Sequence, residues 1–374
     1  MLSVFCAPSR YTQGQNATAW LGQEMAALGL PGPALIVAGR TAVAQLADTW
    51  AKTFSAVGYA YAVLPFGGEC CVAEIERVKA AACREQAGVI VGVGGGKALD
   101  TARAAAADLA LSVVTCPTTA SSDAPCSALS IVYTPEGVFQ EIRSYRRNPD
   151  LVLVDTQVIA RSPARLLVAG MGDALATWFE AKTCVEGGIR NMRGGVSTRS
   201  ALALAELCYR TLLDDGAAAV AAIRTRSVTP SLERIIEANT LLSGLGFESA
   251  GLAAAHAVHN GLTAVPETRP WLHGEKVAFG VLVQIILERQ PRPVVDEVLA
   301  FSTSVGLPVT LAEIGLACMT TEMLDRIAVR STASGETIHN EPFEVSPGMV
   351  AAAVRAADMA GQEWRRRRGL PPPE

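Results

Sequence analysis

Short apolar runs alternate with amphipathic stretches over residues 1–162, and this alternation limits the possible folds more than any other feature. Ala34–Gly39 and Tyr61–Glu69 are apolar runs, and residues 72–86 repeat apolar side chains at helical spacing. Gly88–Leu109 predicts a strand, a glycine loop and a helix, and further strands are predicted in 111–133 and 150–159. We therefore predict an α/β domain built on a parallel sheet.

The composition of the chain changes after Ser162 and Pro163. Segments rich in Ala and Leu replace the β-branched runs, which predicts an all-helical second domain that begins near Pro163. The expected organisation is an α/β nucleotide-type domain at 1–162, a helical domain at 163–364 and a flexible tail at 365–374. A cleft between two such domains is the default position for a site.

The segment GVGGGKALD, Gly92–Asp100, follows one predicted strand and opens a helix. Glycines allow backbone amides to approach an anion, and a helix N-terminus adds favourable partial charge. Val91 and Ala98 exclude a Walker A loop, and Lys97 stands where a GxGxxG fingerprint requires glycine. The alternative is a tight turn with no ligand, but four glycines and a lysine within six residues favour a pyrophosphate site.

Charge and cysteine content exclude several classes of protein. A net charge of −4 and a pI near 5.7 give no reason to expect nucleic acid or a membrane surface as partner. Residues 249–266 carry no formal charge, but two histidines, an asparagine and many small residues make them a poor membrane span. Nine cysteines without a CxxC pair predict reduced thiols in a cytoplasmic protein.

Three of the four histidines in the chain lie between 256 and 273. His256 and His259 are three residues apart and would share a helix face, and a turn-rich connection can bring His273 back toward them. A lone buried histidine is more often structural, whereas three in one segment favour a metal or proton-transfer site. The candidate carboxylate is Asp173, although an acid there could also cap a helix. Spacing alone does not decide between His256 and His259 as the ligand.

Long stretches of the chain resemble the glycerol dehydrogenases, which belong to the metal-dependent ("iron-containing") alcohol dehydrogenases. The fold that this resemblance implies is dehydroquinate synthase-like, and the similarity spans nearly the whole chain. The stretches that carry it are PFGGEC, GVGGGKALDTA, PTTASSDAPCSALSIVYT, VDTQVIA, SPARLLVAGMGDALATWFEA, LSGLGFESAGLAAAHAVHNGLT, HGEKVAFG and GETIHN.

The resemblance also implies a role for particular positions. The metal ligands of the family correspond to Asp173, His256 and His273, which leaves His259 as a second-sphere neighbour that could pass a proton outward. Iron-using relatives have a further histidine where this chain has Thr177, so the three-ligand site suits Zn²⁺. The substrate-contacting aspartate corresponds to Asp123. The dinucleotide contacts correspond to Gly94, Gly95, Gly96, Lys97, Asp100, Thr118, Thr119, Ser121, Ser127, Leu129 and Tyr133.

The implied activity is reversible oxidation of glycerol or a similar small diol, with hydride transfer to NAD. Alternatives are another dehydrogenase of the superfamily, such as one acting on glycerol 1-phosphate, and a lyase resembling dehydroquinate synthase. A phosphorylated acidic substrate would call for more basic residues around the cleft than Lys276, which lies close to the histidine segment. The family also implies a homo-oligomer, commonly an octamer.

Arg40 departs from many glycerol dehydrogenases, which have aspartate at this position. An acid near a strand end can accept hydrogen bonds from the adenosine ribose and repels a 2′-phosphate, whereas arginine offers donors suited to phosphate. The sequence therefore predicts that NADP is accepted beside NAD. The alternative is that Arg40 points into solvent.

Overall fold

The computed structural model describes residues 1–371. The chain divides into two compact units. The sheet unit comprises Cys6–Pro163 together with Ala222–Gly244. The helical unit comprises Met1–Phe5, Ala164–Ala221 and the chain from Leu245 onward. The sequence placed the boundary between 162 and 163 and did not anticipate that residues 222–244 pack with the sheet unit.

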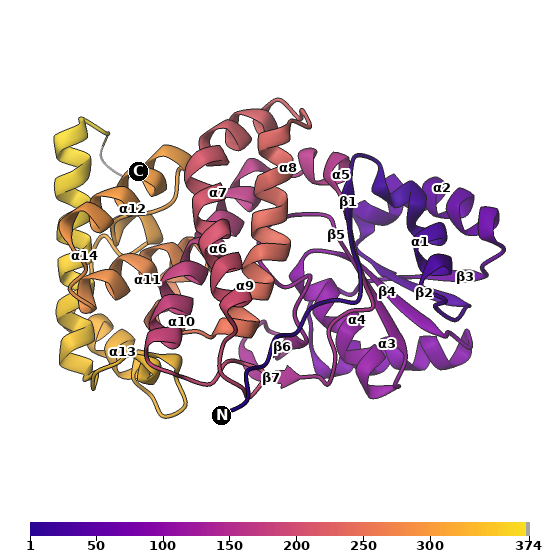
Figure 1. The fold of residues 1–374 in the computed structure, drawn as a ribbon, viewed down its shortest axis with the longest axis horizontal. Helices are drawn as coiled ribbons and strands as arrows, with labels where there is room; N and C mark the ends of the chain where they lie inside the picture. The colour runs from indigo at the N-terminus through magenta and orange to yellow at the C-terminus, as the bar shows by residue number, and fades with distance from the viewer. Residues whose placement is uncertain (372–374) are drawn as a thin grey trace. The chain divides into compact units, whose positions relative to one another are not determined.

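Six parallel strands form the sheet, in the order β1-β8-β5-β4-β2-β3 (Figure 1). The parallel α/β prediction is therefore confirmed. The strands are β1 (Tyr11–Gly14), β2 (Ala34–Ala38), β3 (Tyr61–Pro65), β4 (Val89–Gly94), β5 (Ser112–Pro117) and β8 (Leu151–Asp155). The helices of this unit are α1 (Leu21–Ala27), α2 (Arg40–Val57), α3 (Val72–Arg84), α4 (Gly96–Asp108), α5 (Thr156–Ala160) and α8 (Pro230–Glu237), with a 3₁₀ turn η1 (Ala17–Trp20) and a π-helical turn η2 (Ala238–Leu242).

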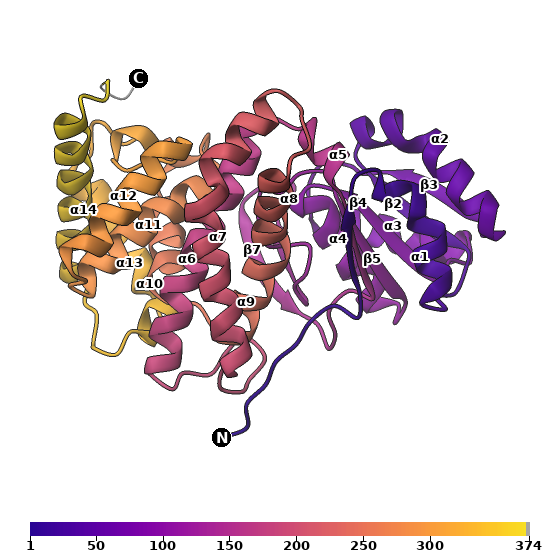
Figure 2. The same cartoon turned by 45° about the horizontal axis from the view of Figure 1, so that its top comes forward.

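Both faces of the sheet are buried because helices cover each of them (Figures 1 and 2). In β2, Ala34, Ile36 and Ala38 face a core that includes side chains of α1 and α2. Leu35 and Val37 face the opposite core, which includes side chains of α3 and α4. A strand buried on both sides has no polar face, which explains why the sequence shows continuous apolar runs here.

Two parts of the sheet unit differ from the sequence prediction. The run predicted as one strand at 150–159 is β8 followed by α5, because the Asp155 side chain accepts hydrogen bonds from the backbone N–H groups of Gln157 and Val158 and caps a helix. Residues 129–144 form an antiparallel hairpin, β6 (Leu129–Tyr133) and β7 (Phe139–Ser144), which the sequence did not predict.

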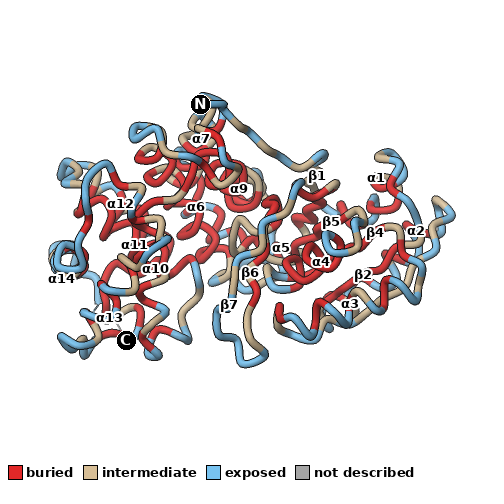
Figure 3. The backbone as a smooth tube through the Cα atoms, turned by 90° about the horizontal axis from the view of Figure 1, so that it is seen from below, coloured by how far each residue is buried: buried red, intermediate tan, exposed pale blue. Residues whose placement is uncertain are grey.

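The second unit is helical in the structure, as predicted. Its helices are α6 (Ala164–Glu186), α7 (Arg199–Arg224, whose last turn belongs to the sheet unit), α9 (Ser243–Ala250), α10 (Ala254–Thr263), α11 (His273–Leu287), α12 (Arg292–Val305), α13 (Thr321–Ser331) and α14 (Pro347–Arg368), with 3₁₀ turns η3 (Pro266–Thr268), η4 (Ala312–Ile314) and η5 (Thr337–Asn340). Much of α6 is buried (Figure 3). The basic run Arg365–Arg368, assigned to a terminal tail on sequence, forms the last turn of α14, and the last three residues of that predicted tail lie outside the described range.

Among residues 1–371, no single helix is long and apolar enough to cross a membrane. One bent pair, Pro230–Ala250 with Ala254–Thr263, passes the length and composition test when its parts are taken together, with a bend of 103° between them.

Candidate functional site

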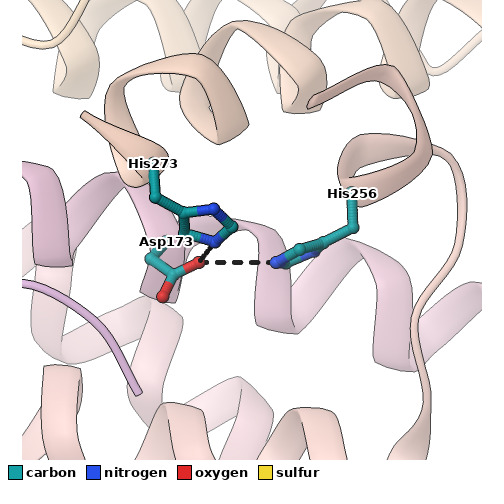
Figure 4. Close-up of side chains that lie close together, drawn as sticks. All are labelled: Asp173, His256 and His273. Carbon is teal, nitrogen blue, oxygen red and sulfur yellow. Dashed lines mark hydrogen bonds and ion pairs between the residues drawn. The ribbon is translucent and has the colours of Figure 1, made fainter. Parts of the chain in front are cut away.

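Three helices of the helical unit bring Asp173, His256 and His273 together. Asp173 lies in the middle of α6, His256 in the first turn of α10, and His273 is the first residue of α11. Figure 4 shows the three side chains pointing toward one another. The Asp173 Oδ1 atom is 3.0 Å from His273 Nε2 and 3.4 Å from His256 Nε2. The sequence cluster is thus also a cluster in space.

Glycines allow the backbones of these helices to approach closely. A Cβ atom on Gly274 would overlap the carbonyl oxygen of Ala169, and one on Gly172 would overlap the carbonyl oxygen of Gly274. Gly172 directly precedes Asp173 in the chain, and Gly274 directly follows His273. On the other side of α11, a Cβ atom on Gly280 would overlap the carbonyl oxygen of Ala255, which precedes His256. The small residues beside each ligand position therefore bring the three side chains within reach.

The geometry of the three ligand atoms fits a small cation. One atom from each side chain lies within 4.8 Å of the other two. A tetrahedral ion with bonds of about 2.0–2.1 Å separates neighbouring ligand atoms by about 3.3 Å, which is close to the two distances from Asp173 Oδ1. Thr177, one turn after Asp173 on α6, supplies no imidazole. One carboxylate and two imidazoles form a donor set that suits Zn²⁺ and also Fe²⁺.

His256 and His273 each have a hydrogen-bond partner at Nδ1, the ring nitrogen that faces away from Asp173. The Nδ1 atom of His256 is 2.6 Å from Glu180 Oε2, and the Nδ1 atom of His273 is 3.0 Å from His259 Nε2. His259 Nδ1 in turn lies 3.1 Å from Asn260 Oδ1. Glu180 accepts a hydrogen bond from His256 Nδ1. With Asn260 Oδ1 as the acceptor for His259 Nδ1, the Nε2 atom of His259 accepts a hydrogen bond from His273 Nδ1. The Nδ1 atoms of His256 and His273 thus carry hydrogen, and their Nε2 atoms are the ones that a metal can bind. This is the tautomer that a metal ligand needs.

Burial and neighbouring charges shift the pKa values of this cluster. Burial opposes ionisation of Asp173, but His273 and His256 outweigh it and hold the pKa of the carboxyl well below its usual range. Burial disfavours a charged His256, yet Glu180 and Asp173 raise its pKa well above the ordinary value. Burial, with His273 and Lys276 nearby, lowers the pKa of His259 well below the ordinary value. His259 is therefore neutral at pH 7, and the carboxylates favour a cation among them.

In the sheet unit, the glycine loop lies at the carboxyl edge of the sheet. Gly94 ends β4, Gly95 precedes α4, and Gly96 begins that helix. Close packing begins just before the loop, since a Cβ atom on Gly92 would lie 2.7 Å from the Cβ atom of Ala102. Cβ atoms on Gly95 and Gly96 would meet no atom closer than 3.7 Å. These are ordinary van der Waals contacts with Thr119, Ser122 and Ala124, so side chains of the next loop lie beside the N-terminus of α4, the position at which an anion would bind.

Other predicted dinucleotide residues surround this loop. The backbone N–H of Thr118 donates to the Gly94 carbonyl at 3.0 Å, and the Thr119 and Ser121 hydroxyls lie 3.2 Å apart. Lys97 Nζ pairs with Glu69 at 2.5 Å and lies 5.1 Å from the centre of the Tyr133 ring. Two further predicted contacts are Ser127, which is buried before the hairpin, and Leu129, which begins β6.

Asp100 makes contacts that connect two elements of the sheet unit. It forms a buried ion pair with Arg103 at 2.8 Å and accepts a hydrogen bond from the backbone N–H of Ile131 in β6. Burial raises the pKa of Asp100 to about 6, although Arg103 opposes the shift. These contacts join α4 to the hairpin, so any contact of Asp100 with a dinucleotide would be indirect.

The last two predicted site residues, Asp123 and Arg40, also lie in the sheet unit. Ser243 donates a hydrogen bond from its hydroxyl to Asp123 Oδ2 at 3.3 Å. Arg40 is exposed at the start of α2, directly after β2, and the neighbouring Gly39 N–H donates to the Val93 carbonyl at 3.2 Å. Arg40 and the glycine loop therefore follow adjacent strands at the same edge. The predicted cleft between the two domains stays a prediction.

Sequence reasoning missed Glu180, the fully buried partner of His256. One signal was available, because Glu180 follows Asp173 by seven residues and so lies on the same face of an otherwise apolar helix. The partner of that carboxylate, 76 positions away in sequence, was not predictable from spacing.

Comparison with known proteins shows the family. The family model for iron-containing alcohol dehydrogenase matches residues 8–156. Glycerol dehydrogenase of Thermotoga maritima is 49% identical over 362 residues, covering 97% of this chain and 98% of that protein. Glycerol dehydrogenase of Escherichia coli O6:H1 is 48% identical over 361 residues, covering 96% and 98%.

A solved structure agrees with these sequence relationships. The crystal structure of glycerol dehydrogenase from Schizosaccharomyces pombe matches with a TM-score of 0.92 at 37% identity, covering 99% of this chain and 95% of that one. The similarity extends over both units, including the helices that carry Asp173, His256 and His273. The chain belongs to the glycerol dehydrogenase family of iron-containing alcohol dehydrogenases.

Proposed function

We propose that this protein is a zinc-dependent polyol dehydrogenase that oxidises glycerol or a similar small vicinal diol to the hydroxyketone and reduces NAD⁺ or NADP⁺. The observation that carries the proposal is the Asp173, His256 and His273 cluster, in a chain nearly half identical to glycerol dehydrogenases along its length. Zinc is preferred because three protein ligands with an open position are typical of catalytic zinc, and Thr177 adds no fourth imidazole. A cytoplasmic location and an oligomeric state stay predictions from the sequence.

The residues of the helical unit would hold the metal. Asp173 would contribute a carboxylate oxygen, and His256 and His273 would contribute their Nε2 atoms, because Glu180 and His259 accept hydrogen bonds from the two Nδ1 atoms. When bound, the metal would supply Lewis-acid chemistry that lowers the pKa of a substrate hydroxyl. The contact of His259 with His273 supports its role as a second-sphere neighbour.

The residues of the sheet unit would bind and orient the reactants. The glycine loop and the N-terminus of α4 would hold the dinucleotide pyrophosphate. Asp123, held by Ser243, would accept a hydrogen bond from a substrate hydroxyl and so fix the carbon that loses hydride. When bound, the nicotinamide ring would supply the acceptor for the hydride and its electron pair, and release of the hydroxyl proton would balance the oxidation.

The experiment is a direct assay with an Asp123→Asn variant beside the wild type. Purified protein is mixed with glycerol and NAD⁺ or NADP⁺, and reduced nicotinamide is followed by its absorbance. We expect turnover in the wild type and at least a tenfold loss of kcat/KM in Asp123→Asn, since one misaligned hydrogen bond of ~1.4 kcal/mol suffices. The dissociation constant for the dinucleotide should not change. No turnover by the wild type with any vicinal diol would refute the function, and an equal loss of cofactor affinity in the variant would make Asp123 a structural loop residue.

Cofactor preference gives a second prediction, at Arg40. One charge-assisted contact between this exposed arginine and a 2′-phosphate contributes ~1.5–3 kcal/mol, or about a tenfold to hundredfold change in preference. We expect Arg40→Asp to lower the ratio of kcat/KM for NADP⁺ to that for NAD⁺ by this factor. Arg84→Asp makes the same charge change at an exposed arginine of α3 and should leave the ratio unchanged. An unmoved ratio in Arg40→Asp would mean that Arg40 points into solvent.

A further inference from the structure

Helix α10, which carries His256, has no cap from its own neighbourhood. Ala253, the residue before the helix, offers no capping side chain, and its backbone has φ −138° and ψ −131°. Four successive backbone N–H groups nevertheless have acceptors, all from side chains far away in the sequence. The pairs are Ala253 and His256 with Glu180 Oε1 (2.9 and 3.0 Å), Ala254 with Glu341 Oε1 (3.2 Å) and Ala255 with Gln284 Oε1 (2.9 Å). These acceptors meet the hydrogen-bonding needs that every helix start has.

Glu180 differs from the other two acceptors because it also contacts a ligand side chain. Its Oε1 atom accepts from the two backbone N–H groups, while its Oε2 atom lies 2.6 Å from His256 Nδ1. Glu180 is fully buried, so no water competes for either oxygen. A carboxylate only accepts hydrogen bonds, so the hydrogen between them belongs to His256 Nδ1. A metal can then bind this imidazole only through Nε2, which lies 3.4 Å from Asp173 Oδ1.

We propose that Glu180 is a positioning residue that fixes both the place and the tautomer of His256 as a metal ligand. Its one oxygen anchors the first turn of α10, which sets where the imidazole lies. Its other oxygen holds the imidazole ring with Nε2 facing Asp173. The inference rests on the metal site of the proposed function, and it concerns how that site is kept ready rather than what reaction it serves.

The variant Glu180→Gln separates these two tasks, because an amide cannot perform both. If the amide oxygen keeps the backbone N–H groups, the amide nitrogen faces His256 Nδ1 and donates to it. The ring hydrogen then moves to Nε2, the atom that must bind the metal. If the amide is turned around, its hydrogens face two backbone donors, and the start of α10 loses its acceptor. Glutamate and glutamine have nearly the same size, so neither outcome comes from a cavity.

Glu341→Gln is the matched control. Glu341 caps Ala254 in the same way, but the structure places no contact between it and Asp173, His256 or His273. Burial and the neighbouring Glu288 raise the pKa of Glu341 to about 9, so this side chain is neutral near pH 7 and glutamine preserves its charge. Both substitutions therefore alter a buried cap of the same helix, and only one alters the partner of a ligand.

The test measures zinc affinity of the purified full-length chain by competition with a chelator, alongside the melting temperature of the metal-free proteins. We expect Glu180→Gln to bind zinc about ten to a hundred times more weakly than the wild type, and Glu341→Gln to remain within about threefold. Wild-type affinity in Glu180→Gln, or equal losses in the two variants, would overturn the proposal. A wild type that binds no zinc would instead refute the metal site on which the proposed function depends.

A measurement on the wild type makes the test independent of how the variant folds. The chain has four histidines, so selective ¹⁵N-histidine labelling gives few resonances to assign. In the zinc-loaded protein we expect His256 to carry hydrogen on Nδ1 and to bind through Nε2. An Nδ1 atom of His256 without hydrogen would overturn the proposal.

Discussion

Replacing His256 with alanine is expected to remove the bound metal and to lower glycerol turnover at least about a thousandfold. Loss of one of three ligands breaks the site, and a catalytic metal contributes several kcal/mol to the transition state, where each ~1.4 kcal/mol is a factor of ten in rate. The measurement is metal content by elemental analysis together with kcat for glycerol. The affinity of the glycine loop for the dinucleotide should be retained.

His339 supplies the control for this substitution. It is the fourth histidine of the chain, it lies in η5, and its Nε2 atom contacts the backbone carbonyl of Ala333. His339→Ala should keep the metal and keep kcat within about twofold, because His339 does not contact Asp173, His256 or His273. Full activity in His256→Ala protein that contains no metal would contradict the assignment of the site.

Gly274→Ala should be among the most destabilising single-methyl additions in the chain. Its Cβ atom would lie 2.7 Å from the carbonyl carbon of Ala169 and 3.0 Å from the backbone nitrogen of Asp173. Because both neighbours are backbone atoms within α6, the two helices must separate, at a cost of about 3 kcal/mol in the free energy of unfolding. The same separation moves His273 away from Asp173, so we also expect weaker metal binding. Denaturant unfolding and chelator competition measure the two effects.

Gly348→Ala is a control at the equivalent helix position. Gly274 and Gly348 are each the second residue of their helix, but a Cβ atom on Gly348 meets no neighbour closer than 3.9 Å. Alanine is the better helix former, so this substitution should leave stability unchanged or raise it by up to ~1 kcal/mol. Equal stability of the two alanine variants would show that α6 and α11 are not in close backbone contact.

Local signals explain how much of the fold was predictable from sequence. The strand that contains Ile36 and Val37 was evident because burial on both faces leaves no polar residue in it. The helix that carries His256 and His259 was evident from a run of small apolar residues with helical spacing. By contrast, the helix after Asp155 was missed. Its start depends on the Asp155 side chain, which accepts hydrogen bonds from the backbone N–H groups of Gln157 and Val158. The hairpin at 129–144 was missed because only the antiparallel partner of each strand defines it.

The candidate site shows the same division between local and long-range information. Spacing grouped the histidines and suggested Asp173, but it left open which of His256 and His259 points at that carboxylate. In the structure, His256 is the histidine of this pair that points at Asp173, and two long-range contacts set the geometry of the site. One is the close backbone packing of α11 on α6 at Gly274, and the other is the hydrogen bond between His256 and Glu180. Residues distant in sequence decide such contacts, so only the folded chain reveals them.

The central claim is that the cluster of Asp173, His256 and His273 binds the metal on which polyol oxidation depends. The most direct measurement strips the purified protein of metal with a strong chelator, returns zinc in steps, and follows bound zinc and glycerol-dependent reduction of NAD⁺ or NADP⁺ in the same samples. We predict no turnover in the stripped protein and a rate that rises in proportion to bound zinc and levels off at one zinc per chain. Undiminished turnover in protein shown to hold no metal, or full zinc occupancy without oxidation of any vicinal diol, would contradict the claim.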